Sequence, residues 1–151
     1  MVEGRSDPPG PGAAGFELLE HTADVGIRAW AGTLEEAFER ATEGLAEVLG
    51  ALGTGASGPG DPVPVEVTAD DLGGLLVDWL NEVLWLREVR EAALAGVEVE
   101  RVGDGVARGT VALASGGAAP DGTFVKAVTY HRLRVEPDPG GGWLVEVYLD
   151  V

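Results

Sequence analysis

The sequence of 151 residues contains no cysteine, and this absence excludes several kinds of site at once. The chain cannot form a disulfide, hold a metal ion through thiolates or use a cysteine nucleophile. A chain without cysteine is also compatible with a reducing compartment. We therefore expect a cytoplasmic protein without thiol chemistry.

Long apolar runs are missing as well, so no segment is expected to span a membrane. Residues 1–15 also lack the apolar stretch of a signal peptide. They are rich in proline and glycine, which predicts a disordered tail. The remaining residues, 16–151, fit a single domain, and a hydrophobic content of 45% is enough to form a core.

Basic residues are scarce, because ten lysines and arginines face 26 aspartates and glutamates, for a net charge of −16. Affinity for nucleic acid comes largely from lysine and arginine side chains that neutralise phosphates. The charge balance therefore argues against direct nucleic-acid binding. Two interpretations of the acidity stay open: it serves solubility alone, or it favours a cation or a basic protein partner.

The clearest helical segment runs from Thr33 to Leu49. Thr33 is a good N-cap residue, and Glu36 follows at the spacing of a capping box. Gly50 is suited to end the helix. Apolar residues gather on one face, and the opposite face is acidic and expected to be solvated: Glu35, Glu36, Glu39, Glu43 and Glu47.

A second amphipathic helix is expected to begin at Asp70 or Asp71 and to run to about Ala93, with Trp79 in its buried stripe. Segments with apolar residues at every second position predict strands: 16–20, 25–30, 63–67, 97–99, 106–113, 124–136 and 143–150. This order predicts an α+β fold, a single compact domain in which two helices pack on one face of a mainly antiparallel sheet.

The longest predicted strand covers residues 124–136 and begins beside Lys126. One row of alternate residues is expected to form the core face, interrupted by its two polar members, Thr129 and His131: Ala127, Thr129, His131, Leu133 and Val135. Lys126 lies in the other row, where a salt-bridging surface role is the ordinary expectation. The histidines, His21 and His131, are each expected to have a structural or hydrogen-bonding role.

Two aspartates are candidate ligands for a metal ion. Asp24 comes directly before a predicted strand, and Asp150 ends another, next to Val151. Two aspartates with a terminal carboxylate or a main-chain oxygen would form a hard oxygen site, suited to Ca²⁺ or Mg²⁺. A capping or solvated role for each aspartate is the alternative. The familiar enzyme motifs, such as a P-loop, a Gly-x-Ser-x-Gly elbow or His-Glu-x-x-His, are absent.

Several blocks match, in order, the motifs of one protein family: Glu20–Ile27, Thr33–Phe38, Asp71–Glu88, Lys126–His131 and Asp150–Val151. Through them the chain resembles the archeases from Phe16 to the end. Lys-Ala-Val-Thr-Tyr-His at 126–131 is the most specific block. Glu20 departs from the aspartate that is common at its position, but it keeps the charge.

The resemblance implies a divalent-cation site in which Asp24 and Asp150 supply side-chain oxygens and Val151 a main-chain or terminal oxygen. Ca²⁺ is the expected ion, with Mg²⁺ or Mn²⁺ as alternatives. Lys126 matches a family residue associated with activation of an RNA ligase. His21 and His131 match the motifs in supporting roles only.

The function implied by the resemblance is that of a non-catalytic cofactor protein. Its partner would be a GTP-dependent tRNA-splicing RNA ligase, whose guanylylation and turnover it would promote during tRNA splicing or RNA repair. Two alternatives use the same residues differently. One is a metal-dependent phosphoester hydrolase with a histidine as the base, and the other is a chaperone-like protein-binding module.

Overall fold

The structure, a computed structural model, describes residues 14–21, 24–50, 60–114 and 123–151. The predicted N-terminal tail lies outside the described residues up to position 13. The described chain forms these elements: β1 (Gly15–His21), β2 (Asp24–Ala31), α1 (Leu34–Leu49), β3 (Asp61–Thr68), α2 (Leu72–Arg90), β4 (Ala93–Gly103), β5 (Val106–Ala114), β6 (Ala127–Pro137) and β7 (Trp143–Asp150).

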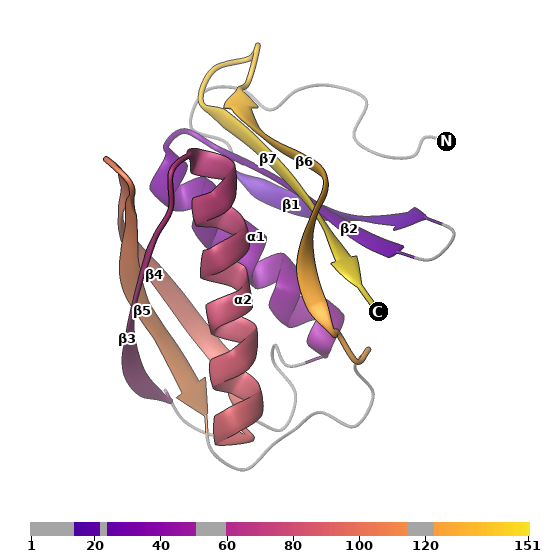
Figure 1. Ribbon diagram of the computed structural model, residues 1–151, viewed down its shortest axis with the longest axis vertical. Coiled ribbons are helices and arrows are strands. Elements are labelled where there is room, and N and C mark those ends of the chain that lie inside the picture. Colours follow the sequence, from indigo (N-terminus) through magenta and orange to yellow (C-terminus); the bar gives the residue numbers. More distant parts are fainter. Residues whose placement is uncertain (1–13, 22–23, 51–59, 115–122) are drawn as a thin grey trace.

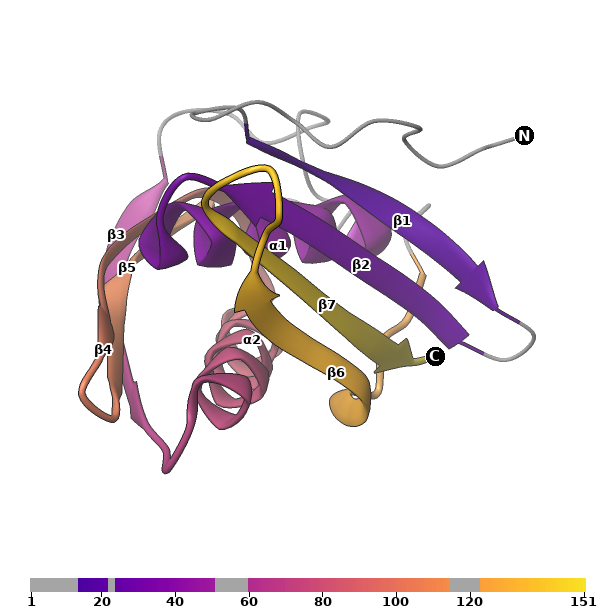
Figure 2. The ribbon, with the colours of Figure 1, turned by 90° about the horizontal axis from the view of Figure 1, so that it is seen from above.

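The strands divide into two antiparallel sheets. The larger sheet has the order β1-β2-β7-β6, and the smaller one has the order β3-β5-β4. Figures 1 and 2 show both helices between the two sheets, so that each sheet has helices on one face only. The predicted class is confirmed, since the domain is α+β, antiparallel and built with two helices. Neither helix is long and apolar enough to cross a membrane within the described part of the chain.

Helix α1 begins and ends at the predicted residues. The Thr33 hydroxyl accepts a hydrogen bond from the Glu36 backbone N–H at 3.1 Å. Gly50 adopts a left-handed conformation with φ of 75°, which glycine allows at little cost, and its N–H bonds the last turn. Local capping chemistry therefore determines both ends of this helix.

Two glutamates on the acidic face of α1 are half-buried and bonded to another strand, whereas this face was predicted to be solvated. Glu39 accepts a hydrogen bond from the backbone N–H of Val99 at 2.8 Å. Glu35 accepts one from Val102 at 2.9 Å. Both donors belong to β4, an edge strand whose unpaired N–H groups would otherwise be open to another strand. The two carboxylates therefore tie α1 to the free edge of the smaller sheet.

Helix α2 starts at the predicted cap, because the Asp71 side chain accepts a bond from the Gly74 N–H at 2.7 Å. It ends at Arg90, earlier than predicted. Glu91 has a left-handed backbone with φ of 48°, and β4 then begins at Ala93. The helix is buried on two sides because it lies between the sheets (Figure 1).

The two helices are joined by a buried polar contact. Trp79 is fully buried, as predicted, and its indole N–H donates to the Thr42 hydroxyl at 3.0 Å. That hydroxyl in turn donates to the Phe38 carbonyl at 2.7 Å. Each polar atom in this chain of bonds has a partner, which removes the cost of burying it.

Replacing Thr42 with valine is expected to lower the free energy of unfolding by about 1–3 kcal/mol. The valine keeps the shape but leaves the Trp79 indole N–H without an acceptor in the core. Chemical denaturation measures the change, and Thr42→Ser, which keeps the hydroxyl, is the matched control. A valine variant as stable as the wild type would contradict this role for the hydroxyl.

Strand β6 contains a bulge that the alternation of residues did not predict. The six residues of β6 from Thr129 to Arg134 lie opposite only three residues of β7, from Tyr148 to Glu146, and Arg132 within the bulge has φ of 54°. The bulge reverses the alternation. Before it, the even-numbered Val128 is buried, and after it the odd-numbered Leu133 packs against the core. Thr129 and His131 therefore do not line the core, and the prediction for these two is wrong.

Candidate functional site

The predicted metal ligands meet at one end of the larger sheet. Asp24 begins β2 and lies directly opposite Asp150, which ends β7. On the other side of β7, Asp150 pairs with Ala127, and its carbonyl accepts a hydrogen bond from the Lys126 backbone N–H at 2.8 Å. Figure 2 shows the C-terminus beside the beginning of β2. We name Asp24, Lys126, Asp150 and Val151 the strand-end site.

The antiparallel register explains why residues so far apart in the sequence become neighbours. Directly opposed residues have Cβ atoms about 4.5–5.5 Å apart and point to the same face of the sheet. Asp24 and Asp150 therefore share one face. Asp150 and Val151 are exposed, and Asp24 is partly so. Two aspartate carboxylates are hard oxygen ligands, which fit a hard cation such as Ca²⁺.

The described residues contain no group of three or more histidine, aspartate or glutamate side chains placed to hold a metal ion. The side chains of the strand-end site thus provide two carboxylates. Ca²⁺ usually takes six to eight oxygens, so the remaining ligands would be main-chain oxygens, such as that of Val151, and water.

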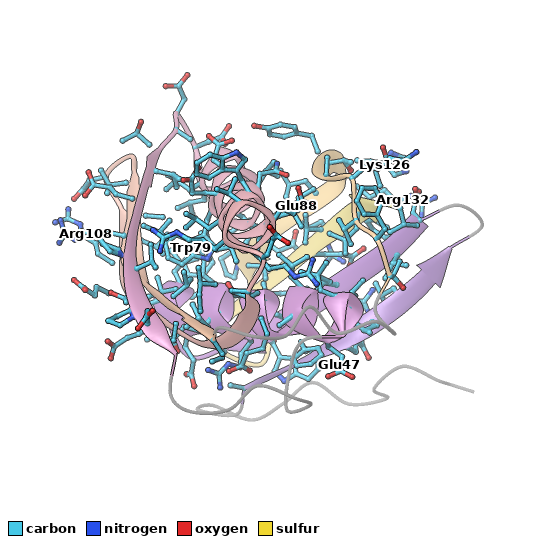
Figure 3. All side chains as sticks on the ribbon, turned by 90° about the horizontal axis from the view of Figure 1, so that it is seen from below. Glu47, Trp79, Glu88, Arg108, Lys126 and Arg132 are labelled. Atoms are coloured by element: carbon cyan, nitrogen blue, oxygen red, sulfur yellow. The ribbon has the colours of Figure 1, made fainter. Side chains whose placement is uncertain are left out.

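The backbone around Lys126 is held by buried neighbours and by α2. Val125 is fully buried, and Asn81 of α2 bonds both main-chain groups of Val128, donating to its carbonyl at 3.0 Å and accepting from its N–H at 2.9 Å. Figure 3 shows the Lys126 side chain directed away from the core. The lysine is therefore an exposed cation on a fixed backbone, and it forms no ion pair with another described residue.

On the face of the sheet that carries Asp24 and Asp150, the next pair of opposed residues is Gly26 and Tyr148, and the tyrosine ring fills this position. Tyr148 is 5% exposed and lies over Gly26, its partner on β2. A Cβ atom at Gly26 would be 2.7 Å from the tyrosine Cε2 atom. On the other side, the Thr129 hydroxyl donates to the Tyr148 carbonyl at 3.0 Å. These contacts hold β2, β7 and β6 together two residues from Asp24 and Asp150.

The histidines differ in what the structure describes of them. His131 lies in the bulge of β6, exposed, with its ring edge-on to that of Tyr148 at a centroid distance of 6.1 Å. Its backbone N–H donates to the Thr129 hydroxyl at 3.2 Å. The backbone of His21 is the partner of Asp24 in the β1–β2 pair, but its side chain lies outside the described atoms. His131 thus contacts Tyr148, and a supporting role for either histidine stays a prediction.

Replacing Gly26 with alanine is expected to lower the free energy of unfolding by about 1–3 kcal/mol, because the new methyl group collides with the Tyr148 ring. Thermal or chemical denaturation measures the change. Gly96→Ala is the matched control, since a Cβ at this strand glycine meets only the Ala112 methyl group at 3.9 Å. Equal losses of stability in the two variants would show that collision with the Tyr148 ring is not the cause.

A row of alternating charges crosses all four strands on the same face of the sheet. Arg28 bonds Glu17 of β1 at 2.9 Å and Glu146 of β7 at 3.0 Å. Arg134 of β6 approaches Glu146 at 3.4 Å and bonds Glu136 at 2.6 Å. The Tyr148 hydroxyl donates to the second oxygen of Glu146 at 3.2 Å. Glu146 is 5% exposed, so this carboxylate is buried and paired.

The ion pairs raise the pKa values of Arg28 and Arg134 and lower that of Glu136, because each pair favours the charged forms. Burial alone would lower the pKa of Arg28, but its hydrogen bonds and charge attraction to the two glutamates outweigh burial and raise it. The hydrogen bond from Arg134 lowers the pKa of Glu136. Sequence reasoning missed this row, although a lone glutamate within the apolar strand 143–150 is a signal for a buried ion pair.

Comparison with known proteins gives a consistent set of similarities. The model of the archease protein family matches residues 16–151. Protein archease of Methanosarcina mazei is 37% identical over 142 residues, which cover 90% of this chain and 95% of that protein. Protein archease of Thermococcus kodakarensis is 33% identical over 141 residues and covers 90% and 98% of the two chains.

Two solved structures are similar to the fold. The solution structure of Methanobacterium thermoautotrophicum protein 1598 has a TM-score of 0.73 at 30% identity, over 91% of this chain and 99% of that one. The crystal structure of a Thermotoga maritima protein, described as an archease and possible chaperone, has a TM-score of 0.55 at 21% identity, over 88% and 94% of the two chains. The second similarity concerns the fold alone.

Proposed function

The chain belongs to the archease family, and we propose that it is a non-catalytic accessory protein that activates a GTP-dependent tRNA-splicing RNA ligase. It would promote guanylylation and turnover of the ligase during tRNA splicing or RNA repair in the cytoplasm. The observation that carries the proposal is the direct pairing of Asp24 with Asp150, next to the Lys126 backbone.

Asp24 and Asp150 would hold a divalent cation through their carboxylates, and Val151 would add a main-chain oxygen. Ca²⁺ is the expected ion, with Mg²⁺ or Mn²⁺ as alternatives. When bound, the ion would supply a centre of positive charge at the end of the sheet. Lys126 would add a second positive charge on a backbone that α2 and buried valines keep in place.

The strand-end site would dock at the active site of the ligase, where the nucleotide reacts. There the two aspartates would deliver or reposition a cation, or the docked surface would reshape the pocket around the nucleotide. Either route works only if this protein binds one state of the ligase better than the other, because a ligand shifts an equilibrium by its differential affinity. Contact with the ligase, and not with RNA, fits the net charge of −16.

Lys126→Ala is expected to remove most of the stimulation of ligase guanylylation while leaving the fold and cation binding intact. The side chain is exposed, so its loss leaves no cavity. Covalent guanylate on the ligase is the measurement, and Lys126→Arg, which keeps the charge, should retain part of the effect. Full stimulation by the alanine variant would exclude a role for this lysine.

Two other functions make different predictions. A metal-dependent phosphoester hydrolase would turn over a generic phosphodiester by itself and lose this activity in Asp24→Ala. A chaperone-like module needs exposed apolar surface, and Trp85 and Val89 of α2 provide some. It would bind several unrelated proteins with similar affinity, whereas an activator should prefer the ligase.

A further inference from the structure

Helix α2 exposes a tryptophan, although most of the helix is buried between the sheets. Trp85 is 55% exposed, whereas Trp79 on the buried side of the same helix has no exposed surface. A single exposed apolar side chain is ordinary on a protein surface. The surroundings of Trp85, and not its exposure alone, make this position informative.

Trp85 lines an open groove between α2 and β3. The strand contributes the first two of the lining residues and the helix the others: Val67, Thr68, Asp78, Asn81, Glu82 and Trp85. Asn81 is already occupied, because its amide bonds both main-chain groups of Val128. The groups that the groove offers to a ligand are therefore the indole ring of Trp85, the carboxylates of Asp78 and Glu82, and the Thr68 hydroxyl.

Asp78 and Glu82 are four residues apart, so they lie on the same side of the helix, and Trp85 follows three residues after Glu82. Neither carboxylate forms an ion pair with another described residue. An indole face attracts a guanidinium or ammonium group, and neighbouring carboxylates add direct charge pairing. The groove is thus suited to an arginine or lysine side chain.

We propose that this groove binds an arginine- or lysine-bearing segment of the RNA ligase, an inference that rests on the proposed function. A protein that binds RNA carries lysine and arginine surfaces, which complement the acidic groove and the net charge of −16. A second copy of the chain is a poor occupant, because two molecules with this charge repel each other.

The groove and the strand-end site are connected through one residue. Asn81 lines the groove and also bonds Val128, two residues after Lys126. The inference requires that one partner reach both places. The groove would contribute affinity for the ligase, while the strand-end site would stimulate guanylylation.

The test is a titration of the ligase with wild type, Trp85→Ala and the double variant Asp78→Asn/Glu82→Gln, following guanylylation. The groove variants should raise the half-saturating concentration at least about tenfold and leave the maximal stimulated rate unchanged. Val89→Ala, an exposed apolar position on the same helix outside the groove, and Glu98→Gln, an exposed carboxylate on β4, are the matched controls. Each should behave as the wild type.

Curves for the groove variants that superimpose on the wild type would overturn the inference and leave the proposed function standing. Calorimetric titration of the same proteins against the ligase distinguishes failure of the groove inference from failure of the proposed function. If the wild type binds but does not stimulate, the proposed activation fails, and a tenfold loss of affinity in Trp85→Ala still supports the groove. If the wild type does not bind the ligase, or if Trp85→Ala abolishes a dimer in sedimentation instead, the inference is overturned.

Discussion

Asp24→Asn and Asp150→Asn are each expected to weaken binding of Ca²⁺ by about one to two orders of magnitude. Each substitution keeps the shape of the side chain but removes one negative charge from the pair of side-chain carboxylates in the strand-end site. The number of charged ligands is a main determinant of Ca²⁺ affinity. Both positions lie at strand ends and are at least partly exposed, so the fold should persist.

Calorimetric titration with Ca²⁺, and then with Mg²⁺ and Mn²⁺, measures this loss. Asp61→Asn is the matched control, because Asp61 is an exposed aspartate at the start of β3, in the other sheet. It should bind the ions as the wild type does. Wild-type affinity in both Asp24→Asn and Asp150→Asn would show that the pair does not hold the ion.

Arg28→Met is expected to lower the free energy of unfolding by about 2–4 kcal/mol, the largest stability effect that we predict. It leaves the buried Glu146 carboxylate without its closest cationic partner, at 3.0 Å. The effect should be smaller than for a fully buried pair, because the Arg28 side chain is 29% exposed and Arg134 remains near Glu146.

Two further variants test this explanation by chemical denaturation. Arg28→Met/Glu146→Met removes both charges and should recover much of the lost stability, because no unpaired buried carboxylate remains. Arg108→Met breaks an exposed pair with Glu100 at 3.8 Å and should cost less than about 1 kcal/mol. Equal losses in the two single variants would contradict the importance of burial.

The parts of the fold that depend on local chemistry could be predicted from the sequence. Thr33 and Gly50 determine the ends of α1 through contacts within a few residues, and Asp71 does the same for the start of α2. The end of α2 could not be predicted, because Glu91 takes a left-handed backbone that gives no sign in the sequence. The partition into two sheets was also hidden, since strand alternation does not identify partners.

The bulge in β6 shows a second limit. Residues 130–133 contain neither glycine nor proline, the usual signs of a break in a strand, yet Arg132 adopts a positive φ and the alternation reverses. The prediction that Thr129 and His131 face the core was wrong for this reason. Bulges depend on pairing with a distant strand, here β7, and a single sequence does not contain that information.

The candidate site was predicted only in part. Asp24, Lys126 and Asp150 came from the family motifs, and the register of β2, β7 and β6 then placed them together. Glu146 and the α2 groove had no motif, and they depend on contacts between residues far apart in the chain. Such contacts include the Asn81 bonds to Val128, which no periodicity predicts.

Activation of the ligase is tested most directly by following guanylylation of the cognate RNA ligase by GTP in the presence of a divalent metal and of catalytic amounts of this protein. We expect the wild type to accelerate formation of the covalent guanylate and RNA joining. Folded Asp24→Asn, Lys126→Ala and Asp150→Asn should not, while Asp61→Asn should match the wild type. No acceleration by the wild type under matched conditions would show that the strand-end site does not activate the ligase.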